Sequence, residues 1–134
     1  MREVAADRFV ASSPAALRRS LSPTALVEYE GSFAPRASRT DGDATVVTVA
    51  GGGLEFDLRF VETDDGWRYE QAGDRGPFDS METTVTVEPA NEGSRVRAVS
   101  RVSLGLPVPL VDRIAGWKRR GELRRLLDAV ADDG

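Results

Sequence analysis

The segment LPVPLVDRIAGWKRRGELRRLLDAVAD, residues 106–132, contains the one long helical pattern in the chain. Pro107 and Pro109 lie at its start, where a missing backbone N–H and a fixed φ suit a first helical turn. No proline follows them. We therefore predict a long C-terminal helix. Because a sheet with one apolar face needs a covering layer, the space between this helix and a sheet is the expected place of a functional site.

Two apolar stripes run along this helix, turned by roughly half a circle from each other. One straight helix cannot press both stripes on one sheet. Either the helix bends or breaks near Gly121, which is the alternative we favour, or the first stripe faces a lid, a second subunit or a membrane. The first stripe is Leu110, Ile114, Trp117 and Gly121, and the second is Leu123, Leu126, Leu127 and Val130.

Six basic residues accompany the stripes. We expect them to form a solvated face with favourable charge near the helix C-terminus. Contact with an anionic surface and binding of an acidic ligand are the less favoured alternatives. The six are Arg113, Lys118, Arg119, Arg120, Arg124 and Arg125.

The composition restricts the class of protein. A chain of 134 residues with 40% hydrophobic and 30% charged residues predicts one domain over residues 1–134, with a real core. No apolar run approaches the length needed to cross a bilayer. The first residues, MREVAAD, lack the apolar segment of a signal peptide, so we expect a cytoplasmic protein.

The chain has no cysteine and no histidine. This excludes disulfides, a thiolate nucleophile, a zinc–thiolate site and a Ser-His-Asp triad. A metal site would need carboxylates alone, and no Asp/Glu spacing resembles a calcium loop. We therefore expect neither a metal nor a cofactor. The net charge of −4 argues against nucleic acid as a partner.

Upstream of the helix, the pattern is mostly that of strands. Residues 3–11 predict a first strand, and Ser13-Pro14 and Ser22-Pro23 begin two short helices over residues 15–21 and 24–30. From there the apolar period is two, and hairpin-length turns join consecutive strands into an antiparallel sheet. Pro35 puts the first of these strands at an edge. The six predicted strands are residues 32–39, 45–50, 54–60, 67–72, 81–88 and 94–104.

Three motifs occur within this order: ASSPAAL at residues 11–17, GPF at 76–78 before a Thr/Val strand, and EGSRV at 92–96. In these motifs and in element order over essentially its whole length, the chain resembles the START-like (SRPBCC) superfamily, which includes polyketide cyclase/dehydrase-like proteins and the birch-pollen allergen. Arg18 departs from the tryptophan of many relatives. The superfamily includes binders, carriers and enzymes, so the resemblance does not define an activity.

The resemblance implies an α+β helix-grip fold. A curved seven-stranded antiparallel sheet would wrap around the long C-terminal helix, with two short helices after the first strand and a cavity between sheet and helix. Pocket residues must then lie on inward faces, and apolar walls with few polar points are typical of small-molecule sites. A filled core would show the same pattern. The predicted ligand-binding residues are Phe56, Leu58, Phe60, Trp67, Tyr69, Phe78, Ser100, Ile114 and Trp117.

Among polar residues, Tyr69 is the best single candidate, because its hydroxyl could orient a ligand or donate a proton. The alternative is a tyrosine at the rim with its tip in water. Gln71 and Ser100 could each fix a polar group of a ligand. Glu28 and Glu30 end the second short helix and could supply a carboxylate base.

Three functions remain open. The favoured one is binding of a hydrophobic or amphipathic small molecule in the cavity. A cyclase or dehydratase would need convergent polar groups inside it, with a strongly shifted pKa, and no such pair is evident in the sequence. An interaction module would dock a protein or a membrane through Leu110, Ile114 and Trp117, and it predicts that this stripe is exposed. Homodimerisation is also left open.

Overall fold

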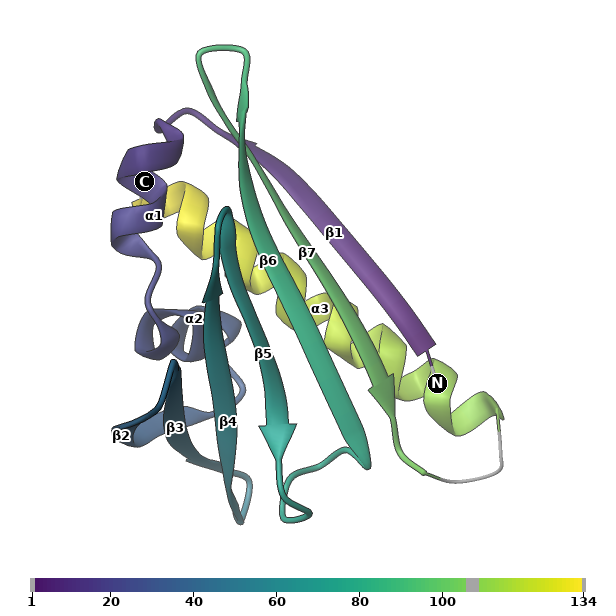
Figure 1. Cartoon of the computed structure of the whole chain (residues 1–134). Helices are drawn as coiled ribbons and strands as arrows, with labels where there is room; N and C mark the ends of the chain where they lie inside the picture. Colours follow the sequence, from purple (N-terminus) through teal and green to yellow (C-terminus); the bar gives the residue numbers. More distant parts are fainter. Residues whose placement is uncertain (1, 106–108, 134) are drawn as a thin grey trace.

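The computed structural model describes residues 2–105 and 109–133. Seven antiparallel strands form one curved sheet in the order β1-β7-β6-β5-β4-β3-β2, and a long helix, α3, runs across its inner face (Figure 1). This confirms the predicted α+β helix-grip fold. The elements are β1 Arg2–Val10, α1 Pro14–Ser20, α2 Pro23–Glu30, β2 Ala34–Asp41, β3 Ala44–Gly51, β4 Leu54–Thr63, β5 Gly66–Ala72, β6 Ser80–Ala90, β7 Gly93–Ser103 and α3 Pro109–Asp133.

Short hairpin turns and one longer β5–β6 loop, residues 73–79, build the sheet from β2 to β7. The β6–β7 turn passes through Asn91 and Glu92, both at positive φ, which suits a two-residue connection between twisted strands. β1 reaches the other side of the sheet and pairs with β7, so β1 and β2 are the two edges. The predicted edge position of Pro35 is confirmed, and the register of β2 shifts between Pro35 and Ala37.

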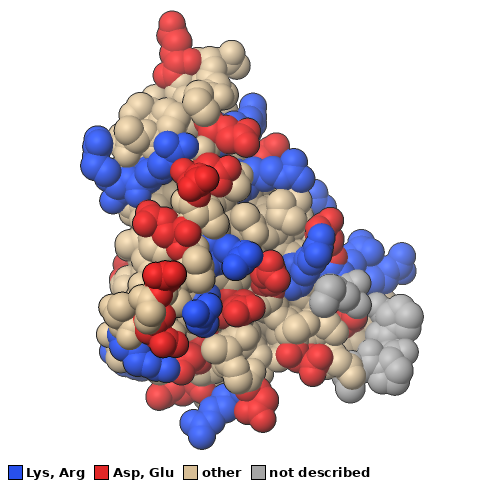
Figure 2. Space-filling model, in the orientation of Figure 1, with Lys and Arg blue, Asp and Glu red and all other residues tan. Residues whose placement is uncertain are grey.

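Alternation along the strands separates the core from the outer surface. On β7, Val96, Ala98, Ser100 and Val102 face inward and are fully buried, as a side-chain period of two requires. On the outer face, charged side chains pair across strands, for example Arg39 with Asp57 at 3.2 Å. Figure 2 shows acidic and basic side chains interspersed over the visible surface.

The two short helices begin as predicted. The side chains of Ser13 and Ser22 accept hydrogen bonds from the backbone N–H groups of Ala16 and Ala25, and such caps satisfy otherwise unpaired donors. Gly31 ends α2 in the left-handed conformation, at φ 81°. The end of α2 lies against α3, so Glu30 reaches the inner face of the long helix.

α3 is uninterrupted over its described length, and its two apolar stripes have different environments. Leu123, Leu126, Leu127 and Val130 are buried against the sheet. The first stripe is exposed instead, with Trp117 79% accessible. The favoured expectation, a bend or break near Gly121 that presses both stripes on the sheet, is therefore wrong, because the first stripe has no partner layer among the described residues. The predicted helix start at residues 106–108 lies outside the described residues.

Within the part of the chain that the structure describes, no helix is long and apolar enough to cross a membrane.

Candidate functional site

A buried arginine occupies the space between helix and sheet. Arg119 projects from the inner face of α3 and is 2% exposed. Its Nε donates to Ser100 Oγ at 3.1 Å, and its Nη2 donates to Thr83 Oγ1 at 2.8 Å and to Tyr69 Oη at 3.3 Å. Strands β5, β6 and β7 thus each present one hydroxyl to the same guanidinium.

Two carboxylates complete this polar cluster. Nη1 of Arg119 forms an ion pair with Glu30 at the end of α2, and it also lies 3.4 Å from Oε1 of Glu122, three residues along α3. Tyr69 donates its hydroxyl proton to Glu30 Oε2. Glu30 therefore binds both the guanidinium and the phenol, whereas the side chain of Glu122 has the guanidinium as its one polar partner among the residues that the structure describes.

The environment determines how the cluster can act as an acid. Burial raises the pKa of the Tyr69 phenol well above its ordinary value, and the nearby Glu30 charge raises it further. Burial alone would lower the pKa of Arg119, but Glu30, Tyr69 and Glu122 outweigh it and raise this pKa. A phenol with a raised pKa, already bonded to a carboxylate, is a weak proton donor at neutral pH. The geometry thus favours an anchoring role for Tyr69 over acid catalysis.

An apolar pocket of about 460 Å³ lies beside this cluster. It is formed by the first half of α3, the end of β7, the β3–β4 turn, the β5–β6 loop and the segment after α2. Glu122 belongs both to the pocket wall and to the polar cluster. The lining residues are Ser32, Phe33, Gly51, Gly52, Leu54, Pro77, Phe78, Leu104, Ile114, Ala115, Lys118 and Glu122.

A side-chain clamp positions one wall of the pocket. Gln71 Nε2 donates to the carbonyl of Phe78 at 2.7 Å, and the N–H of Phe78 donates to Gln71 Oε1 at 3.2 Å. Gly76 passes so close that a Cβ there would lie 2.1 Å from Gln71 Oε1. The β5–β6 loop is thereby held with Phe78 at the pocket.

The structure separates the nine predicted site residues. Phe78 and Ile114 line the pocket, while Tyr69 and Ser100 belong to the polar cluster. Phe56, Leu58 and Phe60 are in the core. Trp67 packs against the edge of the core, where its Nε1 donates to the Leu21 carbonyl at 3.3 Å, and Trp117 is on the outer face of α3. The alternative of a rim tyrosine is wrong, since Tyr69 is 1% exposed.

Sequence reasoning missed the centre of the cluster. The expectation that Arg119 belongs to a solvated basic face is wrong, because its side chain is buried. A signal was available: on a helical wheel Arg119 lies opposite Trp117 and on the same side as Leu123 and Leu126. The position of Glu122 on the pocket wall was also missed.

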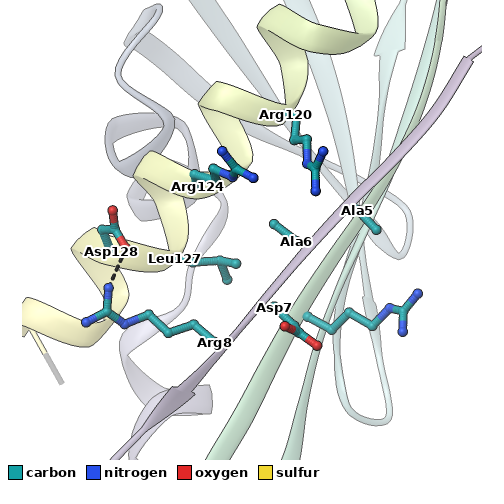
Figure 3. Close-up of a pocket in the computed structure, with 9 residues that line it drawn as sticks. Ala5, Ala6, Asp7, Arg8, Arg120, Arg124, Leu127 and Asp128 are labelled. Atoms are coloured by element: carbon teal, nitrogen blue, oxygen red, sulfur yellow. Dashed lines mark hydrogen bonds and ion pairs between the residues drawn. The ribbon is translucent and has the colours of Figure 1, made fainter.

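A second hollow, of about 560 Å³, lies between edge strand β1 and the second half of α3. Figure 3 shows Arg120 and Arg124 extending from α3 above Ala5 and Ala6 of β1. Within the lining of this hollow, Arg8 of β1 and Asp128 of α3 form an ion pair. Its lining is thus largely charged, in contrast to the apolar pocket.

Comparison with solved structures identifies the fold. Over 98% of its length the chain matches a START superfamily protein from Mycobacterium smegmatis, with 99% of that chain covered, a TM-score of 0.63 and 16% identity. It matches Ara h 8.0201 over 96% of this chain and 97% of that one, with a TM-score of 0.63 and 14% identity.

A third structure is the di-domain ARO/CYC protein BexL, from a biosynthetic pathway. The match covers 96% of this chain but 46% of BexL, with a TM-score of 0.67 and 21% identity. No family model and no curated protein matches the sequence. These likenesses show a START-like (SRPBCC) fold.

Proposed function

We propose that this START-like chain binds a hydrophobic or amphipathic small molecule in the pocket between the sheet and the first half of α3. The single observation that supports the proposal is the pocket itself. Its volume of about 460 Å³ falls within the usual range of roughly 300–1,000 Å³ for small-molecule sites. Aromatic and aliphatic side chains form most of the wall, and a few polar groups adjoin them.

Contacts between side chains hold two parts of the pocket wall in place, as in a pre-formed ligand site. Gln71 fixes the loop that carries Phe78, and Phe33 packs edge-on against Phe56 of β4, with ring centroids 4.9 Å apart. A largely pre-formed apolar pocket binds with little ordering cost. Burial of an apolar ligand there contributes about 25 cal/mol per Å² removed from water.

Native mass spectrometry of freshly purified protein, followed by titration with the neutral fluorescent probe N-phenyl-1-naphthylamine, tests this function. We expect a co-purified mass or saturable probe binding. Ala115→Phe, which fills the pocket from α3, and Phe78→Ala, which removes a wall, should both weaken it. Phe9→Ala is the matched control, because Phe9 is partly exposed and lies outside the lining. No adduct and no probe binding, or equal loss in the control, would contradict the proposal.

A second candidate function is docking of α3 on an anionic membrane surface. It is favoured by the exposed first stripe, in which Leu110 and Ile114 are 59% and 58% accessible. Basic residues flank the stripe on both sides. In α3 between residues 110 and 125 there are two acidic residues, of which Glu122 is buried and Asp112 is partly buried, so the exposed face is mainly basic and apolar. Such a face suits the boundary between anionic headgroups and acyl chains.

The basic residues best placed to meet an anionic membrane surface lie beside Trp117. Arg120 and Arg124 extend from α3 into the hollow between α3 and β1 (Figure 3) and have no acidic partner within 4.0 Å among the described residues. Ile114 and Lys118 belong both to the exposed face and to the pocket wall. A membrane on this face would thus lie next to the ligand pocket.

Co-sedimentation with phosphatidylglycerol-containing vesicles, compared with pure phosphatidylcholine, tests the docking. Each basic residue near the surface contributes about 1 kcal/mol, so Arg120→Gln/Arg124→Gln should weaken binding roughly tenfold or more. Trp117→Ala should weaken it too, and added salt should reduce it. Arg36→Gln/Arg68→Gln is the control with the same charge change. Equal effects of both pairs, no anionic preference, or dimerisation through this face in place of vesicle binding would contradict the docking.

A further inference from the structure

Glu122 places a carboxylate in the wall of the apolar pocket. Resting on the proposed ligand-binding function, we infer that the ligand carries a protonated amine, and that Oε2 of Glu122 accepts its hydrogen bond. The carboxylate would then fix the head group while the apolar wall holds the rest of the molecule.

The accessibility of Oε2 is the first step. Glu122 is 5% exposed and lines the pocket. Its Oε1 lies 3.4 Å from Arg119 Nη1, while Oε2 has no hydrogen bond to any described residue. In the described part of the chain, no side-chain oxygen or nitrogen sealed from solvent lacks a partner. Oε2 is therefore not sealed, and the pocket is the space beside it.

The charge of the cluster is the second step. Arg119 supplies one positive charge, and Glu30 and Glu122 supply two negative charges when both are ionised. Glu30 is the better satisfied of the two, because it accepts from both Arg119 and Tyr69. Glu122 thus shares its one cation, Arg119, with Glu30, and a second cation at Oε2 would complete the pairing of this buried carboxylate.

The other two cations near Glu122, Lys118 and Arg125, do not pair with its carboxylate. Lys118 lines the same pocket one turn before Glu122, but its side chain is exposed and lies beyond 4.0 Å from any carboxylate of the described residues. Arg125 donates to the Glu30 carbonyl at 2.9 Å and to Ser32 Oγ at 3.1 Å. A ligand ammonium at Oε2 would complete the pairing, with its apolar body against Phe33, Phe78 and Leu104.

Three probes of equal chain length test the inference: dodecylamine, dodecanol and dodecanoate, each used to displace N-phenyl-1-naphthylamine. In the wild-type protein the amine should compete roughly tenfold better than dodecanoate, as a charge-assisted hydrogen bond predicts. Glu122→Gln should abolish this preference, measured as the ratio of the amine and carboxylate affinities within the same protein. Glu82→Gln makes the same charge change on the outer face of β6 and should retain the preference.

A second measurement uses the wild-type chain, so that the inference can be tested even if the Glu122→Gln protein does not fold. Dodecylamine should shift the carboxyl-carbon NMR resonance of Glu122 but not that of Glu82, and dodecanol should shift neither. Equal affinities for the three probes, a preference that survives Glu122→Gln, or no shift at Glu122 would overturn the inference while leaving the pocket as a binding site. Absence of binding by all probes would instead contradict the proposed function itself.

Discussion

Arg119 and Glu30 form a buried ion pair across 89 positions of sequence. The pair joins the middle of α3 to the end of α2, and through Arg119 it also connects to hydroxyl groups of β5, β6 and β7. One side chain therefore fixes the position of the long helix over the sheet. It also places Glu122, one turn further along, at the apolar pocket.

Arg119→Met should destabilise the protein by about 3–5 kcal/mol, because it leaves two buried carboxylates without their cation. Urea unfolding at neutral pH measures the change. The loss should be partly recovered in Arg119→Met/Glu30→Gln, since the double variant removes one unpaired charge. Arg120→Met, an exposed neighbour, should change stability by less than about 0.5 kcal/mol. A similar effect at both positions would refute the buried arrangement.

Tyr69 should make the fold sensitive to alkaline pH. Its pKa is raised in the folded protein, whereas in the unfolded chain it is about 10. Below pH of about 10 both states hold the proton and the contribution is complete. Above it the unfolded state loses the proton first, so stability should fall by up to about 1.4 kcal/mol per pH unit.

The pH dependence can be isolated because the chain has 2 tyrosines. Tyr29→Phe leaves Tyr69 as the single one, and Tyr29→Phe/Tyr69→Phe removes both. The unfolding free energy should fall more steeply with pH in the first protein than in the second. Parallel curves would show that Tyr69 titrates alike in the folded and unfolded states.

The two stripes of α3 should differ sharply in their effect on stability. Leu126 is fully buried, so Leu126→Ala should cost about 2–5 kcal/mol. Ile114 is 58% exposed, and Ile114→Ala should cost less than about 1 kcal/mol. Thermal unfolding of the two variants checks this. The reverse order would mean that the helix faces the sheet with its other side.

Gln71→Ala should weaken ligand binding more than it weakens the fold. It removes both hydrogen bonds that hold Phe78, and the freed loop must then be ordered on binding. We expect probe affinity to fall about threefold to tenfold with a small change in melting temperature. Glu70→Ala, an exposed position on the same strand, is the control. Unchanged probe affinity in Gln71→Ala would show that the clamp does not support the pocket.

Short-range patterns in the sequence predicted most of the fold. Ser13 and Ser22 mark the two short helices because a serine cap and a following proline act locally. The alternation in residues 54–60 and 94–104 identified buried strand faces, since the side-chain period of a strand is two. Hairpin turns then implied an antiparallel sheet, and the motif order indicated the helix-grip arrangement.

The helical wheel also identifies the inner face of α3, but the prediction drawn from it is wrong. The wheel shows two stripes that cannot both face one sheet, and a bend near Gly121 is the expectation that the structure contradicts. Exposure of Trp117 was the second alternative, and the sequence offered no means of choosing, because burial depends on which layer covers a face. Arg119 was assigned to solvent by its residue type rather than by its angle on the wheel.

The sequence by itself therefore determined the elements, their order and the inward faces of the strands, because these depend on neighbours a few residues apart. Only the tertiary structure decided what those faces enclose. Arg119, Glu30, Tyr69, Thr83 and Ser100 come from five different elements, and their meeting depends on strand order and helix placement. Whether the space between helix and sheet is an apolar pocket or a filled core likewise depends on the distance between α3 and the sheet near Glu122. No local sequence pattern encodes that distance.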